Sequence, residues 1–442
     1  MTAPVSERDA VRRLLQRVGL GPRPGELDAA AAQGFDATLA RLTSSTVPDP
    51  GVAVSPAPPS ATPGLTRGDR QLSPEQRRAT RQQEKDRVEQ LSLWWLDRMA
   101  AVEAPYPERL VFFWHGHFAT SVKKVKSAAL MLTQNETFRR LGGGDFRDLA
   151  RALVVDPAML VWLDGGGNRR GKPNENLSRE LMELFMLGVG HYGEADVREG
   201  ARALTGWRVD RATDSAAFVP QAHDGGPQTV LGSTGSFDAP GLVELLAAQP
   251  ASPQFLAGRV WRRFVSDTPP EPATLNSLVA GYGPGRDITG LLRAAVGAPA
   301  FRDPGSVLVR QPMEWLVGAL RALRLRPSAM PATAQQAVRT GLVALGQVPF
   351  APPDVGGWPS GSGWLTTTAS LARLRIAQAL ASAGDIGAVA EASPGARADA
   401  AAALLGLPAW TDRTRAALTP LARQPAQLVA LALASPENTV SA

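Results

Sequence analysis

The sequence predicts a mainly α-helical protein with one small β excursion. Three observations support this fold class. Long stretches carry helix-forming patterns, Ser, Pro and Gly stand where such stretches begin and end, and only one stretch has an extended texture. Hydrophobic residues make up 44% of the 442 residues and charged residues 20%, which is ordinary for a globular chain. We therefore expect a sizeable core within a single large helical domain.

The N-terminal part divides into two regions of different character. Residues 6–43 contain two short helical patterns separated at Gly21 and Pro22, so we expect residues 1–45 to form a helical arm packed on the rest. Residues 46–73 are rich in Pro, Ala, Ser and Thr without periodicity, which predicts a flexible, exposed and protease-sensitive loop. The main helical domain then covers residues 74–442.

Within that domain, Ser73 before Pro74 predicts the start of a long helix that is charged at first and apolar later. The following "PERLVFFWHGHF" is apolar on every side, which indicates a buried helix. Further helices are predicted at 127–140, 145–155, 174–187, 194–207, 240–248, 252–265, 287–297, 311–324, 334–346 and 366–383.

Two stretches interrupt the helical texture. Near 216–232, "AAFVPQAHDGGPQTVLG" has two short extended pieces around a Gly-rich turn, which predicts a β-hairpin. Residues 346–365 form a Pro- and Gly-rich loop that carries Trp358 and Trp364. These two indoles either close over a substrate or attach their own loop to the core.

Composition excludes several classes of function. The chain has no cysteine, so disulfides, thiolate nucleophiles, iron–sulfur clusters and thiolate-bound haem or zinc are excluded. No apolar run approaches the roughly 20 residues that span a membrane, and the N-terminus lacks a secretory pattern, so we expect a cytoplasmic protein without membrane association. The net charge of +6 comes from arginines spread among acids, so we expect no nucleic-acid partner.

The stretch "FFWHGHF" carries two of the four histidines, His115 and His117. In a continuous helix, side chains two positions apart point about 200° away from each other, whereas at a helix end they could converge. Gly116 and the following "ATS" suggest that the helix ends here. Either the pair holds a metal or cofactor, or both imidazoles are hydrogen-bonded core residues.

Glu180 stands out in "NENLSRELMELF" because it falls among leucines, where a carboxylate must be paired, protonated or bound to a metal. Glu175, Arg179 and Glu183 follow helical spacing, which predicts a salt-bridged ladder. Glu180 is therefore a candidate for proton transfer. The alternative is a buried ion pair with Arg179 or Arg202.

His223 and Asp224 lie in the Gly-rich turn "QAHDGGPQT", and functional residues concentrate on such loops. The alternative is an ordinary turn in which Asp224 caps the backbone. We expect His115, His117 and His223 to converge as metal ligands, with Glu180 and Asp224 as catalytic groups.

This donor set, which lacks thiolates, suits a transition metal such as iron or copper, and the aromatic surroundings also fit histidine-bound haem. Trp114 and Arg179 are the candidate cofactor-binding side chains. Zinc is disfavoured because the spacing matches no usual structural zinc pattern.

Successive motifs of the chain also resemble one bacterial family. "ERLVFFWHGHFATS", "NENLSRELMELFMLGVGHYGEADVREGARALTGW", "HDGGPQTVLG" and "GQVPFAPPDVGGWPSGSGW" occur in order over nearly the whole sequence. They look like the family called domain of unknown function 1800. The resemblance implies a largely helical fold and supplies no settled activity. Members are often exported, so the resemblance implies export where the N-terminus predicts the cytoplasm.

Two classes of function follow from these residues. The first is a metal- or haem-dependent oxidoreductase acting on a small organic molecule. The second is a non-catalytic assembly or binding protein that works with a partner enzyme, in which the histidines are core residues and the Trp-bearing loop is a contact surface.

Overall fold

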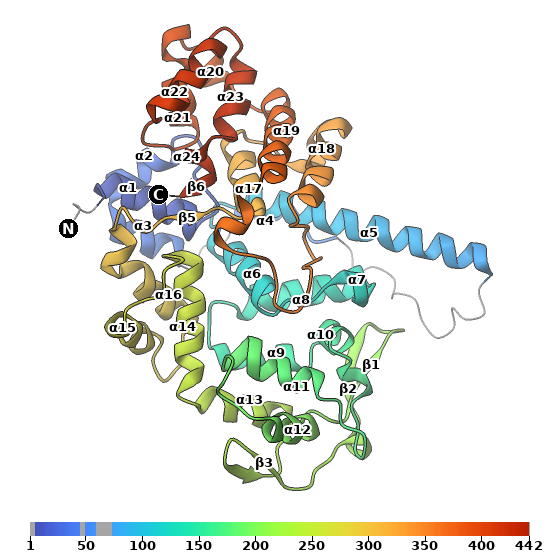
Figure 1. Ribbon diagram of the computed structural model, residues 1–442. Coiled ribbons are helices and arrows are strands. Elements are labelled where there is room, and N and C mark those ends of the chain that lie inside the picture. Colours follow the sequence, from blue (N-terminus) through green and yellow to red (C-terminus); the bar gives the residue numbers. More distant parts are fainter. Residues whose placement is uncertain (1–4, 45–48, 59–72, 442) are drawn as a thin grey trace.

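The computed structural model describes residues 5–44, 49–58 and 73–441 of the chain (Figure 1). Over these residues it contains 24 helices and three two-stranded antiparallel sheets, which confirms the predicted mainly α fold. Buried apolar side chains form one cluster that runs from Ala10 to Leu433. No helix in the described ranges is both long and apolar enough to cross a lipid bilayer.

The N-terminal region forms three helices rather than the two that the sequence predicts. They are α1 (Glu7–Arg17), α2 (Glu26–Gln33) and α3 (Phe35–Leu42). Helix α1 lies beside β6 (Val440–Ser441) at the other end of the chain, and the Arg17 guanidinium donates to the carbonyls of Val265, Ser306 and Ser441. Most of α1 is buried, so this segment is part of the core.

The segment predicted as a flexible loop has a described middle part. Here α4 (Pro50–Ala53) packs against α5 (Pro74–Ala101). The Asp49 carboxylate accepts from two backbone amides beyond the end of α5, and the Trp94 indole N–H donates to the Ser55 carbonyl. Residues 46–48 and 59–72 of the predicted loop lie outside the described part of the chain.

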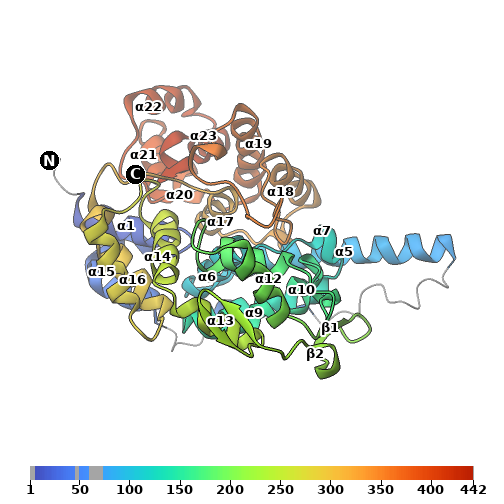
Figure 2. The same cartoon turned by 60° about the horizontal axis from the view of Figure 1, so that its bottom comes forward.

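Helix α5 begins as predicted, with Ser73 at its N-cap and a capping box closed by Gln76. Its first half is charged and largely exposed, and it projects from the body of the molecule in both views (Figures 1 and 2). Its second half is buried against α6 (Tyr106–His117). The predicted burial of α6 is confirmed, and its one acid, Glu108, accepts from Arg98 and Arg139.

The four helices predicted between 127 and 207 all form, although α11 and α12 are each shorter than their predicted ranges. They and their short neighbours are α7 (Val122–Val125), α8 (Ala128–Leu141), α9 (Phe146–Val154), α10 (Pro157–Trp162), α11 (Asn176–Glu180) and α12 (Glu194–Ala203). After α11 the chain continues as a π-helical segment, Leu181–Met186.

The β excursion is two hairpins, not the single one that the sequence predicts. Strand β1 (Trp207–Asp210) pairs with β2 (Ser215–Phe218), and β3 (Gln228–Val230) pairs with β4 (Ser233–Gly235). The two predicted extended pieces are β2 and β3. Each pairs with a neighbour outside the predicted turn, so the Gly-rich stretch connects two hairpins.

The second half of the chain is helical apart from β5 (Leu308–Val309), which pairs with β6. Its helices are α13 (Ala239–Ala248), α14 (Ala251–Phe264), α15 (Pro272–Tyr282), α16 (Ile288–Gly297), α17 (Pro312–Ala322), α18 (Ala332–Ala344), α19 (Thr367–Ala383), α20 (Gly387–Ala390), α21 (Arg397–Leu404), α22 (Asp412–Leu418), α23 (Pro425–Leu433) and α24 (Pro436–Thr439). The six helices predicted between 240 and 383 are all present, and α15 is not among the predicted ones.

Candidate anion-binding pocket

A pocket opens where the C-terminal parts of α6 and α14 meet β5, β6 and the start of α17. Residues 356–361 of the loop before α19 close one side of it. The cavity volume is about 130 Å³. A single water occupies roughly 10–15 Å³ on the same measure, so the space admits a small molecule rather than one ion.

The wall of this pocket is strongly cationic. Six arginines line it, against the two carboxylates of Asp267 and Glu314, which leaves an excess of four positive charges. The arginines are Arg17, Arg109, Arg259, Arg262, Arg263 and Arg310. A concave wall of one sign of charge concentrates ions of the opposite sign, so the pocket attracts anions.

Part of this charge is used to hold the protein together. The Glu314 carboxylate is in contact with Arg109, and it accepts from Arg263 Nη2 at 2.6 Å and from the backbone amide of Gln311 at 2.8 Å. Arg310 donates to the Asn438 side chain and to the Glu314 carbonyl. These contacts position the walls, although the buried Arg310 Nε has no hydrogen-bond partner among the described residues.

Arg259 and Arg262 are different, because within the described ranges neither donates a hydrogen bond or forms an ion pair. Both lie on α14, one turn apart. Burial lowers the pKa of Arg259, and the neighbouring Arg262 lowers it further. Burial raises the pKa of Asp267. The charges of Arg262 and Arg263 lower it by less, so the net shift of the Asp267 pKa is upward. A bound anion between Arg259 and Arg262 would offset the repulsion between their two positive charges.

His117 lines the same pocket and is 2% exposed. Its Nε2 lies 2.9 Å from the Phe185 carbonyl, and its Nδ1 has no hydrogen-bond partner in the described parts of the chain. Burial holds the pKa of His117 well below its usual value, with a further contribution from the Arg259 charge. The imidazole is therefore neutral at physiological pH.

The loop at 356–361 lies directly against the end of α6. Gly357 has φ +87°, and a Cβ there would stand 2.2 Å from the Gly116 carbonyl oxygen, so only glycine fits. This contact places the Trp358 ring 5.1 Å from His115 and 6.1 Å from Phe112. The Trp358 Nε1 is buried and has no acceptor among the residues described.

His115 does not share a site with His117. Helix α6 continues through both residues and ends at Phe118, so the two rings lie in different surroundings. The Phe350 amide donates to His115 Nε2 at 3.0 Å, and the ring packs against Trp95. Burial lowers the pKa of His115 to about 3. His115 has the environment of a satisfied core residue.

Trp114 is fully buried, donates to the Gly142 carbonyl and stacks on Phe146. It therefore packs the core behind the histidines.

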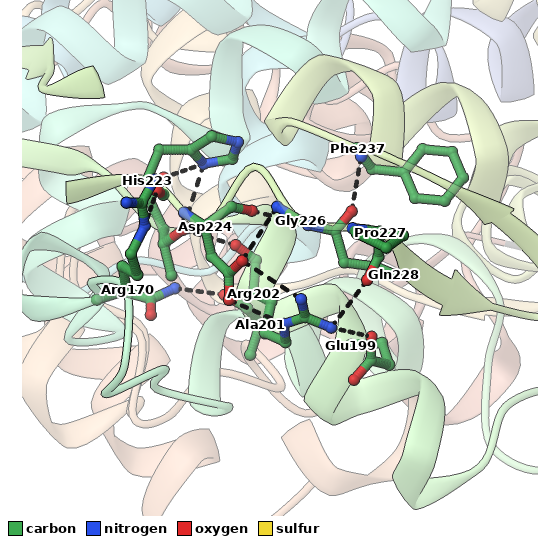
Figure 3. Close-up of polar contacts among 12 residues, drawn as sticks. Arg170, Glu199, Ala201, Arg202, His223, Asp224, Gly226, Pro227, Gln228 and Phe237 are labelled. Carbon is green, nitrogen blue, oxygen red and sulfur yellow. Dashed lines mark hydrogen bonds and ion pairs between the residues drawn. The ribbon is translucent and has the colours of Figure 1, made fainter. Parts of the chain in front are cut away.

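His223 and Asp224 lie in a polar network at the end of α12 (Figure 3). The His223 Nδ1 lies 3.0 Å from the Thr205 carbonyl, and the Thr205 hydroxyl accepts from the Asp224 amide at 2.7 Å. The Asp224 carboxylate accepts from Arg202 Nε at 2.9 Å. The hydrogen bond from Arg202 lowers the pKa of Asp224. The network ties the connection between the two hairpins to α12.

Glu180 is half-buried on α11, and neither Arg179 nor Arg202 pairs with it. Burial raises the pKa of Glu180, and the nearby Glu183 raises it further. The predicted Glu175–Arg179 pair is present, and Arg179 also binds Glu194. The third member of the predicted ladder, Glu183, instead accepts from the Tyr192 hydroxyl.

These neighbourhoods do not bring the predicted metal ligands together. Within residues 5–44, 49–58 and 73–441, no group of three His, Asp or Glu residues is arranged to hold a metal ion. A metal or haem site at His115, His117 and His223 therefore stays a prediction from the sequence. Of the residues singled out there, His117 and Trp358 line the pocket.

The arginines of α14 are not among the residues predicted from the sequence. Their signal is the segment "GRVWRRF", in which Arg259, Arg262 and Arg263 follow i, i+3, i+4 spacing and so share one helix face. These three are the only arginine or lysine residues between Arg211 and Arg286, so the local concentration of arginine was a readable signal.

Fold and pocket together define a mainly helical protein with an arginine-lined cavity between α6 and α14. The chain belongs to the family described as protein of unknown function (DUF1800), whose model matches residues 13–440. No curated protein and no solved structure matches the chain significantly.

Proposed function

We propose that this protein binds a small anionic molecule in the pocket between α6 and α14. The observation that carries the proposal is the pair of cations on α14, Arg259 and Arg262, which line the cavity and form no hydrogen bond or ion pair among the described residues. Arg262 is exposed, but Arg259 is partly buried, and removing a cation from water is costly unless an opposite charge compensates it. A bound carboxylate, phosphate or related oxyanion supplies that charge.

Arginine is well suited to this role. Its planar guanidinium donates paired hydrogen bonds to carboxylate and phosphate oxygens. Arg109 and Arg263 form ion pairs with Glu314, which fixes this wall of the pocket. Arg259 and Arg262 form no ion pair in the described chain and can bind a ligand.

Ligand binding requires no cofactor, and it is compatible with the second class of function inferred from the sequence, a non-catalytic assembly or binding protein that works with a partner enzyme. The pocket would serve equally as the substrate site of the first class, an oxidoreductase. The oxidoreductase activity and its metal or haem stay predictions from the sequence, because the described residues include no group of three ligands arranged to hold a metal ion.

The test is a calorimetric and thermal-shift screen of the purified chain with phosphate, sulfate, malate, succinate and citrate. We expect saturable binding of at least one anion that weakens as NaCl is raised, because salt screens the attraction. At a ligand concentration 100 times Kd, binding stabilises the fold by about 2.7 kcal/mol.

A matched pair of variants locates the site. Arg259→Gln should lose most of the binding, whereas Arg413→Gln, at an exposed position on α22, should bind like the parent. Equal binding by both variants, or no saturable binding of any anion, would overturn the proposal.

A further inference from the structure

A second concave surface, here called the basic groove, is lined by residues from 160–174 together with Val209 and Arg211. It lies between α10, the 3₁₀ helix Gly165–Gly167, the loop that follows it and β1. Helix α7 packs against α10, and α7, α10 and β1 lie side by side in both views (Figures 1 and 2). The volume of the basic groove is about 620 Å³, and it shares no lining residue with the pocket between α6 and α14. A ligand of the basic groove is therefore distinct from the ligand of that pocket.

Basic side chains gather at this groove. Two contacts attach α7 to its lining, since Lys124 Nζ donates to the Asp164 carboxylate at 2.8 Å and Arg211 Nη2 donates to the Val125 carbonyl at 2.6 Å. Three cations line the groove and three more lie on or directly after α7. They are Lys123, Lys124, Lys126, Arg169, Lys172 and Arg211.

The acids in this region do not cancel that charge. Asp164 is the one acid among the lining residues that the structure describes. Asp210 and Asp214 belong to β1 and to the turn that joins it to β2. Counting all three, six cations are set against three carboxylates, which leaves an excess of three positive charges. A concave surface with such an excess concentrates negatively charged partners.

The lysines distinguish the basic groove from the rest of the molecule. Of the 47 basic residues only five are lysines, and four of these five are Lys123, Lys124, Lys126 and Lys172. Many arginines of this chain donate to its own backbone carbonyls, as Arg17 does. Lysine is a compact, hydrated charge without the planar fork of arginine. The side chains of Lys123, Lys126 and Lys172 are exposed and form no hydrogen bond or ion pair with the described residues, so their charges are available to a partner.

The lining also has an apolar component. It comes from Leu160, Val161, Pro173 and Val209, of which Leu160 is buried and the other three retain accessible surface. Apolar surface that a partner covers favours binding, in addition to the attraction between charges. None of the described lining residues is aromatic. A single-stranded nucleic acid therefore finds no ring on which its bases could stack.

The groove is open to solvent along much of its lining. Asp164, Gly167, Arg169, Lys172 and Pro173 are all exposed. A small-molecule site normally surrounds most of its ligand, whereas this surface can cover only one side of one. An open groove of this kind fits an extended chain that continues beyond it at both ends.

We propose that the basic groove binds an extended acidic segment of a partner protein, in which apolar side chains alternate with carboxylates. The carboxylates match the excess positive charge, which accelerates association and orients the segment. Its apolar side chains cover Val161, Pro173 and Val209. A second copy of this chain fits poorly, because both copies carry a net charge of +6. The proposal is independent of anion binding in the pocket between α6 and α14.

The test uses fluorescently labelled decapeptides and the full chain, with anisotropy as the readout. The probe alternates Asp and Val, one control alternates Asp and Ser, and a second control alternates Lys and Val. We expect the Asp–Val peptide to bind at least about tenfold more tightly than either control, and its affinity to fall as NaCl is raised. Equal binding of the Asp–Val and Lys–Val peptides would overturn the proposal. Tighter binding of an oligothymidine of the same length would also overturn it, in favour of a nucleic acid.

Two double variants with the same net charge locate the site. Arg169→Glu with Lys172→Glu should weaken binding of the Asp–Val peptide at least about tenfold, because attraction becomes repulsion. Arg413→Glu with Arg423→Glu reverses two exposed charges on and after α22, which is far from β1 in Figure 1, and should bind like the parent. All four side chains are exposed, so both variants should fold. Equal weakening in both would show a non-specific effect of net charge and overturn the site.

The parent protein gives a readout without any substitution. A water-soluble carbodiimide joins a carboxylate to a lysine amine that it contacts, and mass spectrometry of the digest identifies the lysine. The Asp–Val peptide should be joined to Lys172, which lines the basic groove, and excess unlabelled peptide should suppress this product. Products at Lys85 alone, or none at all, would overturn the proposal and leave the pocket between α6 and α14 unaffected.

Discussion

The pocket on α14 and the turn that carries His223 and Asp224 contain similar residue types but differ in charge balance. In the turn, Arg202 is matched by Asp224 and Glu199, and the Asp224 carboxylate also accepts from the Gly226 amide (Figure 3). In the pocket, Arg259 and Arg262 form no ion pair in the described chain, and six arginines face two carboxylates. A cluster whose charges cancel stabilises the fold, whereas a cluster with a surplus has capacity for a ligand.

The two histidines of α6 show the same difference at the level of single atoms. His115 Nε2 accepts from the Phe350 amide, so its acceptor is satisfied by the protein. His117 Nδ1 is buried without a donor in the described residues. Both rings are neutral because both are buried, and only the second has an unused hydrogen-bonding position facing away from its backbone partner.

The largest effect is expected where the pocket wall is internally paired. Glu314→Gln leaves Arg109 and Arg263 buried without their carboxylate, so the free energy of unfolding should fall by roughly 3–5 kcal/mol. Anion affinity should rise, because one competing negative charge is gone. Chemical denaturation and calorimetry measure the two quantities, with the exposed Glu89→Gln as the control. Unchanged stability would show that the Glu314 contacts do not hold the wall.

The next largest loss of stability is expected where the loop at 356–361 contacts the end of α6. Gly357→Ala introduces a Cβ 2.2 Å from the Gly116 carbonyl at a positive φ, which should cost about 1–3 kcal/mol. Because Trp358 moves with that backbone, anion binding should weaken as well. Gly395→Ala is the matched control, since a Cβ there meets nothing within 4 Å. A Gly357→Ala protein with parental stability and affinity would separate the loop from the pocket.

A smaller effect is expected in the balanced turn. Asp224→Asn should lower the free energy of unfolding by about 1 kcal/mol at neutral pH, since the Arg202–Asp224 pair is partly exposed. Anion affinity should not change. Loss of anion binding in the Asp224→Asn variant would show that the turn and the pocket do not act independently.

The same pair gives a pH dependence with a definite sign. The Arg202 hydrogen bond lowers the pKa of Asp224 below its usual value of about 3.8. Its contribution to stability is therefore fully present above pH 3.8 and is lost as the pH falls through the lower folded-state pKa. Denaturation curves of parent and Asp224→Asn should converge in that acidic range.

Chelation of metal ions is expected to have no effect on anion binding. Dialysis against EDTA should leave the affinity for malate or phosphate unchanged, because the arginines alone provide the charge. Metal analysis and an absorption spectrum of the same sample test the metal- or haem-dependent oxidoreductase directly. A stoichiometric metal or a haem band would support that class, and loss of anion binding after EDTA would contradict the metal-free pocket.

Much of the fold could be predicted because its signals are local. The cap at Ser73 and Pro74 and the apolar run of α6 are each contained in a dozen residues. Helix α15 is not among the predicted helices, although Leu275, Leu278, Val279 and Tyr282 follow the i, i+3, i+4, i+7 spacing of a helix face and its signal was present in the sequence. The hairpin pairing was missed because β2 and β3 are four and three residues long, and so short a strand does not specify its partner.

The candidate site was harder to predict, because it depends on contacts between residues far apart in sequence. The sequence pointed to His117 and Trp358, and the structure brings both to one cavity. It could not separate Arg259 from the many arginines that bind backbone carbonyls, such as Arg17. Whether an arginine has a counter-ion is decided by the tertiary packing around it.

The central claim is that an oxyanion occupies the pocket between α6 and α14, and anomalous diffraction tests it most directly. Crystals of the parent chain soaked with arsenate, a heavy analogue of phosphate, give a signal that locates the anion. We expect a peak within hydrogen-bonding reach of Arg259 and Arg262, beside His117 and Trp358. An empty pocket at saturating arsenate, with peaks only at surface positions or none, would contradict it.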